Sequence, residues 1–272
     1  MMNYHVLVVS DGTGETANRM FKAAMLQFSE DVFITRHANV RDKKQIREIF
    51  KRTLSDHVLV VYTFVSDELR KYTRELAKKQ GAHSIDVLGS TMETLSTLFH
   101  KSPVAKPGLL HRVDEEYYAR VSAIEFAIRH DNNNSLEGLE TADIVLVGVS
   151  RTSKTPLGIY LAQEGWKVAN LPVIESKQLP KKLFKIDQKK IVALSMDPKR
   201  LAEMRRARLR LGVKDESYAD VDFIKRELKF AQSLYSETTW PVIDVTGKSV
   251  EELSQEVLDA MMPYFTESFG NP

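Results

Sequence analysis

The stretch that decides the fold covers residues 143–165 and has the sequence Asp-Ile-Val-Leu-Val-Gly-Val-Ser-Arg-Thr-Ser-Lys-Thr-Pro-Leu-Gly-Ile-Tyr-Leu-Ala-Gln-Glu-Gly. Its apolar run at 144–147 is typical of a strand that is covered on both faces of a sheet. Gly148 ends this strand, and a helical pattern follows from Thr155, with Pro156 in the first turn, where proline is favoured. This order of strand, turn and helix predicts one unit of an α/β fold.

The turn between this strand and helix carries a phosphate-binding pattern with one departure. Residues 148–155 fit G-x-x-x-x-G-K-[ST], except that Ser153 stands in place of the second glycine. In that pattern backbone N–H groups surround the phosphates, the lysine neutralises the terminal phosphate and the hydroxyl holds Mg²⁺. Here those roles fall to Lys154 and Thr155, and Arg151 adds a second cation or lies on the surface. Because glycine permits a left-handed backbone, Ser153 either accepts strain or implies a different turn.

Composition narrows the class of protein. The chain has 272 residues, 43% of them hydrophobic, which is enough for one large or two ordinary domains. The net charge is only +2 and basic residues are scattered, so nothing argues for nucleic-acid binding. The chain has no cysteine, which excludes disulfides, thiolate zinc sites and cysteine nucleophiles. It shows no signal peptide pattern and no apolar run near the roughly 20 residues that span a bilayer, so we expect a cytoplasmic protein without membrane contact.

Short apolar runs alternate with amphipathic segments along most of the chain. In the first hundred residues we expect strands at 4–9, 32–37, 57–64 and 84–88, and helices at 15–28, 43–54, 66–80 and 92–99. Farther along we expect strands at 144–147, 167–171, 190–195 and 242–245, and helices at 155–164, 198–211, 218–234 and 250–264. Such alternation favours parallel strands joined by crossover helices. The prediction is an α/β fold with two lobes of mostly parallel strands, of which the C-terminal one is P-loop-kinase-like.

A loop rich in proline separates the two series. Prolines and a glycine between residues 103 and 108 interrupt the rhythm, and one further helix is expected at 114–130, ended by the turn-forming run at 131–134. The predicted organisation is an N-terminal α/β domain at 1–105, a connecting loop and helix at 106–140 and a nucleotide-binding kinase/phosphorylase domain at 141–272. The basic segment at 199–210 has helical spacing and predicts a solvated helix face rather than a phosphate-binding one.

Three aspartates near strand ends are further candidates for catalysis or metal binding. Asp197 follows the strand at 190–195 and either binds Mg²⁺ or caps the next helix. Asp11 lies in the glycine-containing turn at 10–16, where it serves as a base or metal ligand unless the turn is an ordinary one. Asp244 is a weaker candidate of the same kind.

A charged loop contains His111 and Arg112, which either contact a ligand or have a structural role. The remaining histidines have no spacing typical of a metal site, so the sequence predicts no metal-histidine cluster.

Several blocks along the chain carry a resemblance to one family. They lie at residues 9–17, 107–109, 114–118, 123–131, 143–156, 196–201 and 240–246. In this order the blocks resemble the regulatory proteins of pyruvate, phosphate dikinase, which are unusual serine/threonine kinases. The same family includes regulators of phosphoenolpyruvate synthetase, whose loops tend to carry Cys-Gly where this chain has Thr152 and Ser153. The dikinase version is therefore the better match.

The resemblance implies a bifunctional enzyme whose protein substrate is the dikinase. It implies that the β-phosphoryl group of ADP moves to an active-site threonine and inactivates the dikinase. It also implies reactivation by inorganic phosphate, which removes the phosphoryl group as pyrophosphate. The family's nucleotide loop corresponds here to Gly148, Val149, Ser150, Arg151, Thr152, Ser153, Lys154 and Thr155.

Within that scheme we expect Lys154 at the transferred β-phosphate, Thr155 at Mg²⁺, and Asp11 or Asp197 as proton acceptor or metal ligand. One alternative is the same chemistry on phosphoenolpyruvate synthetase, and another is a nucleotide-binding sensor without catalysis. The sequence is compatible with a homodimer and leaves the catalytic base and the number of active sites open.

Overall fold

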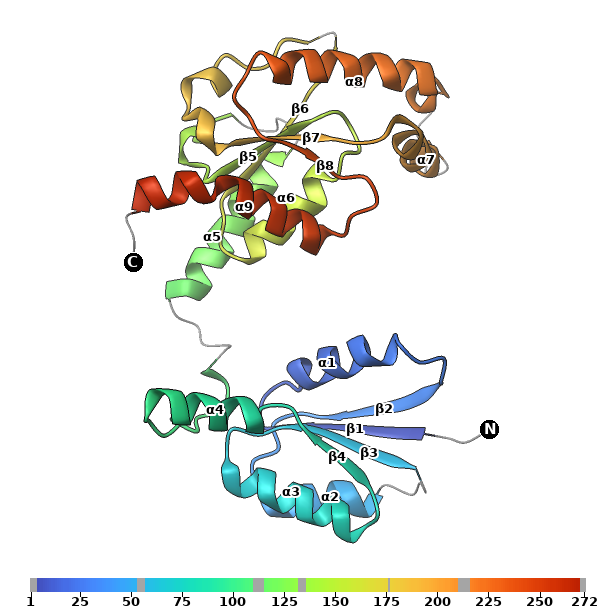
Figure 1. Cartoon of the computed structure of the whole chain (residues 1–272), viewed down its shortest axis with the longest axis vertical. Helices are drawn as coiled ribbons and strands as arrows, with labels where there is room; N and C mark the ends of the chain where they lie inside the picture. Colours follow the sequence, from blue (N-terminus) through green and yellow to red (C-terminus); the bar gives the residue numbers. More distant parts are fainter. Residues whose placement is uncertain are drawn as a thin grey trace. The chain divides into compact units, whose positions relative to one another are not determined.

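The chain forms two compact units, Met1–Arg112 and Val113–Pro272 (Figure 1). The structure, a computed structural model, describes residues 4–52, 57–109, 115–131, 136–175, 177–209 and 216–269. Each unit contains a four-stranded parallel sheet with helices between the strands, which confirms the prediction of two α/β lobes. In the described part of the chain, no helix is long and apolar enough to cross a membrane.

The first unit is a parallel sheet with helices on both faces. Its elements are β1 (Tyr4–Ser10), α1 (Glu15–Met25), β2 (Val32–His37), α2 (Lys43–Arg52), β3 (Val58–Thr63), α3 (Asp67–Lys79), β4 (His83–Asp86) and α4 (Gly89–Phe99), and the strand order is β2-β1-β3-β4. Val6 and Val8 of β1 pack with Phe21 of α1, whereas Leu7 and Val9 pack on the side of α2 and α3. Alternate residues of a strand point to opposite faces, so this uniformly apolar strand is covered twice.

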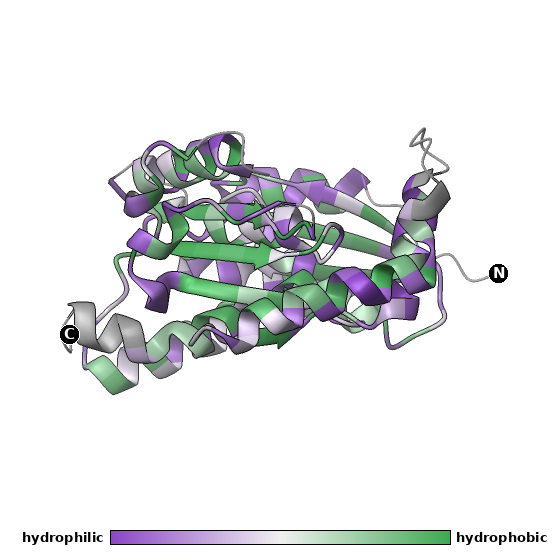
Figure 2. Cartoon of the chain, turned by 90° about the horizontal axis from the view of Figure 1, so that it is seen from above, coloured by the Kyte–Doolittle hydropathy of each residue, from purple (hydrophilic) through white to green (hydrophobic). Residues whose placement is uncertain are grey.

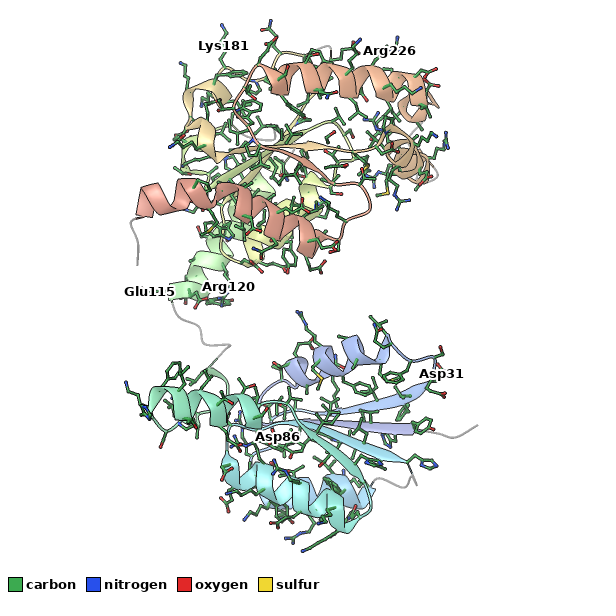
Figure 3. All side chains as sticks on the ribbon, in the orientation of Figure 1. Asp31, Asp86, Glu115, Arg120, Lys181 and Arg226 are labelled. Atoms are coloured by element: carbon green, nitrogen blue, oxygen red, sulfur yellow. The ribbon has the colours of Figure 1, made fainter. Side chains whose placement is uncertain are left out.

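Helix α4 begins at Gly89, three residues earlier than the predicted start at Met92. Asp86, labelled in Figure 3, lies at the end of β4. It accepts a hydrogen bond from the Gly89 backbone N–H at 2.8 Å. A Cβ atom at Gly89 would overlap the carboxylate of Asp86, so glycine is needed where the helix starts. The apolar periodicity missed this boundary because a local side-chain bond sets it.

The second unit repeats the same arrangement. Its elements are α5 (Glu115–Arg129), β5 (Ile144–Gly148), α6 (Lys154–Gln163), β6 (Val168–Pro172), β7 (Ile191–Ser195), α7 (Pro198–Leu209), α8 (Val221–Ser236), β8 (Val242–Asp244) and α9 (Val250–Phe269), and the strand order is β6-β5-β7-β8. Helices α5, α6 and α9 lie on one face of the sheet and α7 and α8 on the other (Figure 1). The apolar strands lie between more polar helices (Figure 2).

Two predicted helix boundaries in this unit are wrong: α9 continues to Phe269 instead of ending at Tyr264, and another helix starts later than predicted. The predicted helix at 218–234 is instead a short 3-10 helix, Glu216–Ala219, followed by α8. The carboxylate of Asp220 accepts a hydrogen bond from the Phe223 N–H at 2.8 Å and caps the new helix. Aspartate is a favoured N-cap residue, so the chain restarts its helix there.

The strand order determines where a ligand can bind. Strand β5 lies between β6, which follows it in the chain and pairs with one of its edges, and β7, which pairs with its other edge. In open α/β sheets, ligands bind at the carboxyl ends of the strands where the order reverses in this way. The turn after Gly148 and the residues after Ser195 lie at this point.

Candidate phosphate-binding site

The turn after β5 folds tightly back on itself. The Thr152 hydroxyl is buried and donates a hydrogen bond to the Val149 carbonyl at 2.9 Å. A Cβ atom at Gly148 would lie 2.6 Å from the Thr152 Oγ1 and 3.1 Å from the carbonyl oxygen of Leu194 in β7. The first glycine of the pattern is therefore required for the turn to lie against the neighbouring strand.

Two residues of the turn adopt left-handed backbone conformations that glycine usually supplies. Arg151 has φ 76° and Ser153 has φ 59°. Of the two alternatives raised by the sequence, Ser153 thus accepts the strain. Strained residues of this kind cost of order 1 kcal/mol or more and cluster at functional sites. Within the described residues, the backbone N–H groups of Ser150, Arg151 and Ser153 have no hydrogen-bond acceptor, so they are available to an anion.

Lys154 points into the turn instead of into solvent. Its side chain is buried, and Nζ donates to the carbonyl oxygens of Gly148 and Val149, each at 2.8 Å. Burial lowers the pKa of Lys154 to about 7, while the nearby charge of Asp131 opposes this shift and that of Arg205 adds to it. A phosphate oxygen in the turn would give the ammonium group a stronger partner than these carbonyls, because hydrogen bonds between charged groups are stronger than neutral ones.

Thr155 contacts a carboxylate that the sequence analysis did not select. Its hydroxyl donates to Asp131 Oδ1 at 2.9 Å, and the side-chain amide of Asn170 donates to the same oxygen at 2.9 Å. Asp131 lies two residues after the end of α5, and the sequence pattern indicated only a turn at this position. The sequence did contain a signal for a functional role of Asp131, because this residue is the last one of the block at 123–131, on which the family resemblance partly rests.

These residues meet at a cavity of about 690 Å³ beside the turn. Among the described residues that line it, Asp131 is the acidic one; these residues are Asp131, Ser150, Arg151, Ser153, Lys154, Thr155, Pro156, Pro172, Met204, Arg208 and Tyr218. The Tyr218 hydroxyl lies 2.7 Å from the Ser150 hydroxyl, so the segment before α8 contacts the turn directly. A cavity with two arginines, a lysine and free backbone N–H groups suits a phosphorylated ligand.

Arg205 holds the turn from behind. It is fully buried and donates to Glu227 Oε2 at 2.6 Å, to the Tyr218 carbonyl at 3.1 Å and to the Ser150 carbonyl at 3.1 Å. Its guanidinium also lies 4.5 Å from the centre of the Tyr218 ring. The prediction of a solvated face for the basic segment at 199–210 is thus wrong for Arg205, because its partner Glu227 is distant in sequence.

The two aspartates of the second unit that the sequence analysis selected have local structural roles. Asp197 is exposed after β7, and its Oδ1 accepts the N–H groups of Lys199 and Arg200, each at 2.9 Å, which caps α7. Asp244 accepts hydrogen bonds from the hydroxyl and N–H of Thr246, and the hydroxyl contact keeps the pKa of Asp244 below its usual value.

Asp11 belongs to the first unit and not to the unit that contains the turn. Its Oδ2 accepts the Val65 N–H at 2.8 Å, and burial raises the pKa of Asp11. His111 and Arg112 lie outside the described residues. Among the described residues there is no group of three or more His, Cys, Asp or Glu side chains that could hold a metal ion.

Comparison with known proteins identifies the family. The sequence profile of the family described as kinase/pyrophosphorylase matches residues 6–258. The chain belongs to this family. Membership confirms the resemblance seen in the sequence blocks and supports a kinase, that is, a phosphotransferase activity.

Relatives within the family match nearly the whole chain. A protein of Geobacter sulfurreducens is 41% identical over 261 residues, which cover 94% of this chain and 97% of the relative. A protein of Shouchella clausii is 42% identical over 250 residues, covering 91% and 92%. One of Bdellovibrio bacteriovorus is 40% identical over 259 residues, covering 94% and 92%. All three are named as pyruvate, phosphate dikinase regulatory proteins.

Proposed function

We propose that this protein regulates pyruvate, phosphate dikinase by reversible phosphorylation of a threonine. In one direction the threonine oxygen attacks the β-phosphorus of ADP, AMP leaves, and the dikinase becomes inactive. In the other direction inorganic phosphate attacks the phosphothreonine, pyrophosphate leaves and the hydroxyl is restored. The observation that supports the proposal most is the turn at 148–155, which presents Lys154 and unpaired N–H groups to a cavity at the strand-order reversal. The names of the relatives support the dikinase as the target.

The proposed chemistry needs alignment and charge neutralisation more than covalent help. The N–H groups of Ser150, Arg151 and Ser153 hold the phosphates of ADP. Lys154 exchanges its two carbonyl partners for the β-phosphate, and Arg151 adds positive charge where the transition state gains negative charge. Since the same groups suit phosphate and pyrophosphate, one site can carry both reactions.

Magnesium fits the oxygen-bearing side chains at the mouth of the turn. Mg²⁺ prefers oxygen ligands and usually keeps several waters beside one or two protein groups and the substrate phosphates. The Thr155 hydroxyl is the first such group, and a carboxylate oxygen lies 2.9 Å from it. When bound, the ion neutralises phosphate charge that the protein leaves uncompensated.

The proton of the attacking threonine requires an acceptor. Asp197 is our first candidate because its exposed carboxylate follows β7, the strand next to β5. Asp11 of the first unit is the alternative. A cytoplasmic location and a homodimer also remain predictions.

Labelled ADP tests the proposal directly. Purified dikinase and phosphoenolpyruvate synthetase are each incubated with the protein and [β-³²P]ADP. We expect label on a threonine of the dikinase and no label with Lys154→Ala, whereas Lys229→Ala, which removes an exposed lysine of α8, leaves labelling unchanged. Label on the synthetase alone would change the target. If ADP binds and neither protein is labelled, the nucleotide-binding sensor is the better description.

The reverse reaction distinguishes one site from two. Phosphorylated dikinase is incubated with [³²P]phosphate, and formation of labelled pyrophosphate is measured. With one shared site Lys154→Ala abolishes both activities. Full phosphorolysis in this variant would require a second site.

A further inference from the structure

Asp131, to which the proposed mechanism gives no named role, is held in place by hydrogen bonds from other elements of the fold. Its Oδ1 accepts one hydrogen bond from Thr155 in the turn and one from Asn170 in β6, both at 2.9 Å. Two donors from different elements fix the orientation of this carboxylate at the wall of the cavity. The Thr155 hydroxyl thus has a defined acidic partner before any ligand binds.

The residues around Asn170 leave room for its side chain beside Asp131. Asn170 is 2% exposed, and its backbone N–H donates to the His130 carbonyl at 3.0 Å, which ties the end of α5 to β6. A Cβ atom at Gly158 of α6 would lie only 3.0–3.1 Å from the side-chain amide of Asn170, so glycine makes room for that amide. Within the described residues the buried Asn170 Oδ1 has no hydrogen-bond partner. Burying an oxygen without a hydrogen-bond partner is unfavourable. We infer that the position of this side chain is set by its NH₂ group, which donates to Asp131.

One oxygen of Asp197, a predicted candidate for the metal carboxylate, already caps α7. In P-loop enzymes the hydroxyl of the loop and an aspartate hold the ion together. Asp197 has the strand position expected for that aspartate, but its Oδ1 already accepts two N–H groups of α7. The carboxylate that does contact the Thr155 hydroxyl is Asp131, which reaches the turn from α5.

We propose that Asp131 is the positioning residue of the magnesium site, orienting Thr155 and supplying, with it, the protein's oxygens next to the phosphates of ADP. This inference rests on the proposed function and deepens it, because it gives Asp131 the metal role for which the sequence suggested Asp11 or Asp197. It leaves Asp197 as a candidate proton acceptor.

The test compares Asp131→Asn with the matched variant Asp197→Asn. Asparagine keeps an oxygen that can accept from Thr155 and Asn170, so the local fold should persist while the charge is lost. ADP affinity is measured by calorimetry in magnesium chloride and again in EDTA. In the wild type and in Asp197→Asn we expect magnesium to strengthen ADP binding. In Asp131→Asn we expect unchanged affinity in EDTA and a loss of about 10–100-fold in the magnesium enhancement, as for other residues that orient metal ligands.

A second variant keeps the charge and removes its support. Asn170→Ala leaves the carboxylate of Asp131 in place without the hydrogen bond from Asn170, so we expect a smaller loss of the magnesium enhancement. Electron paramagnetic resonance with Mn²⁺ and ADP provides a readout that does not depend on transfer activity. Thermal unfolding of each variant identifies any general loss of structure.

The outcomes distinguish the magnesium role of Asp131 from the proposed function of the protein. A full magnesium enhancement in folded Asp131→Asn overturns the inference and leaves the ADP site intact. Loss of the enhancement in Asp197→Asn alone also overturns it and returns the metal role to Asp197. Absence of ADP binding by the wild type in both buffers overturns the proposed function itself.

Discussion

Replacement of Gly148 by alanine tests the geometry of the turn. The added Cβ would lie 2.6 Å from Thr152 Oγ1 and 3.1 Å from the carbonyl oxygen of Leu194. The hydroxyl can move only by breaking its buried hydrogen bond to Val149, and the carbonyl belongs to β7. Neither contact can relax without displacing the turn from the sheet.

The expected loss of stability follows from these contacts. Overpacking of a well-packed interior costs about 1–3 kcal/mol. For a domain the size of the second unit, each 1 kcal/mol lowers the melting temperature by about 2–4 °C. We therefore expect Gly148→Ala to melt roughly 2–12 °C below the wild type. ADP affinity should fall as well, because the turn that holds the phosphates is displaced.

A double mutant shows whether the clash is the cause. Thr152→Ala removes the oxygen at 2.6 Å and by itself should cost about 1 kcal/mol for the lost hydrogen bond. If the clash is the cause, the double variant loses less unfolding free energy than the two single variants lose together, and the difference should be about 0.5–3 kcal/mol. Gly12→Ala is the control, since a Cβ there meets nothing closer than 3.7 Å, and it should melt near the wild type. Additive losses, or a Gly148→Ala protein as stable as the wild type, would refute this reasoning.

Substitutions at three other positions probe the charge, the strain and the support of the turn. Because burial lowers the pKa of Lys154 to about 7, below its ordinary 10.5, the folded state binds fewer protons than the unfolded state between these values. The free energy of unfolding should therefore rise with pH across this window, by at most about 1.4 kcal/mol per pH unit. Urea unfolding at several pH values measures this dependence, which should disappear in Lys154→Met and persist in Lys229→Met. Ser153→Gly should change the unfolding free energy by less than about 1 kcal/mol, whereas Ser153→Val should lower it by about 1–3 kcal/mol, as thermal melts will show. Arg205→Met leaves Glu227 without its buried partner and should cost about 3–5 kcal/mol in urea unfolding, so a loss below 1 kcal/mol would contradict the role of Arg205.

The parts of the fold that were predictable from sequence are those set by neighbouring residues. The apolar run of β5, Gly148 and the helix after it lie within one short stretch, so periodicity and turn chemistry were sufficient to place them. The alternation of strands and helices also predicted both sheets. The two units share one strand order although no sequence repeat was evident, because similar patterns of burial can be met by different apolar residues.

The parts that were missed depend on residues distant in sequence. Asp131 gains its role only because α5 ends beside Thr155 and because β6 supplies Asn170. Arg205 resembles its exposed basic neighbours until the fold brings Glu227 and the turn against it. No local pattern distinguishes such residues from an ordinary helix end or a solvated helix face.

Calorimetric titration of the full chain with ADP in the presence of magnesium tests the central claim most directly. The account predicts saturable binding by the wild type and its loss in Lys154→Ala, because Lys154 supplies the charge at the phosphates. Absence of binding by folded wild-type protein, or equal affinity in Lys154→Ala, would contradict the assignment of the turn at 148–155 as the nucleotide site.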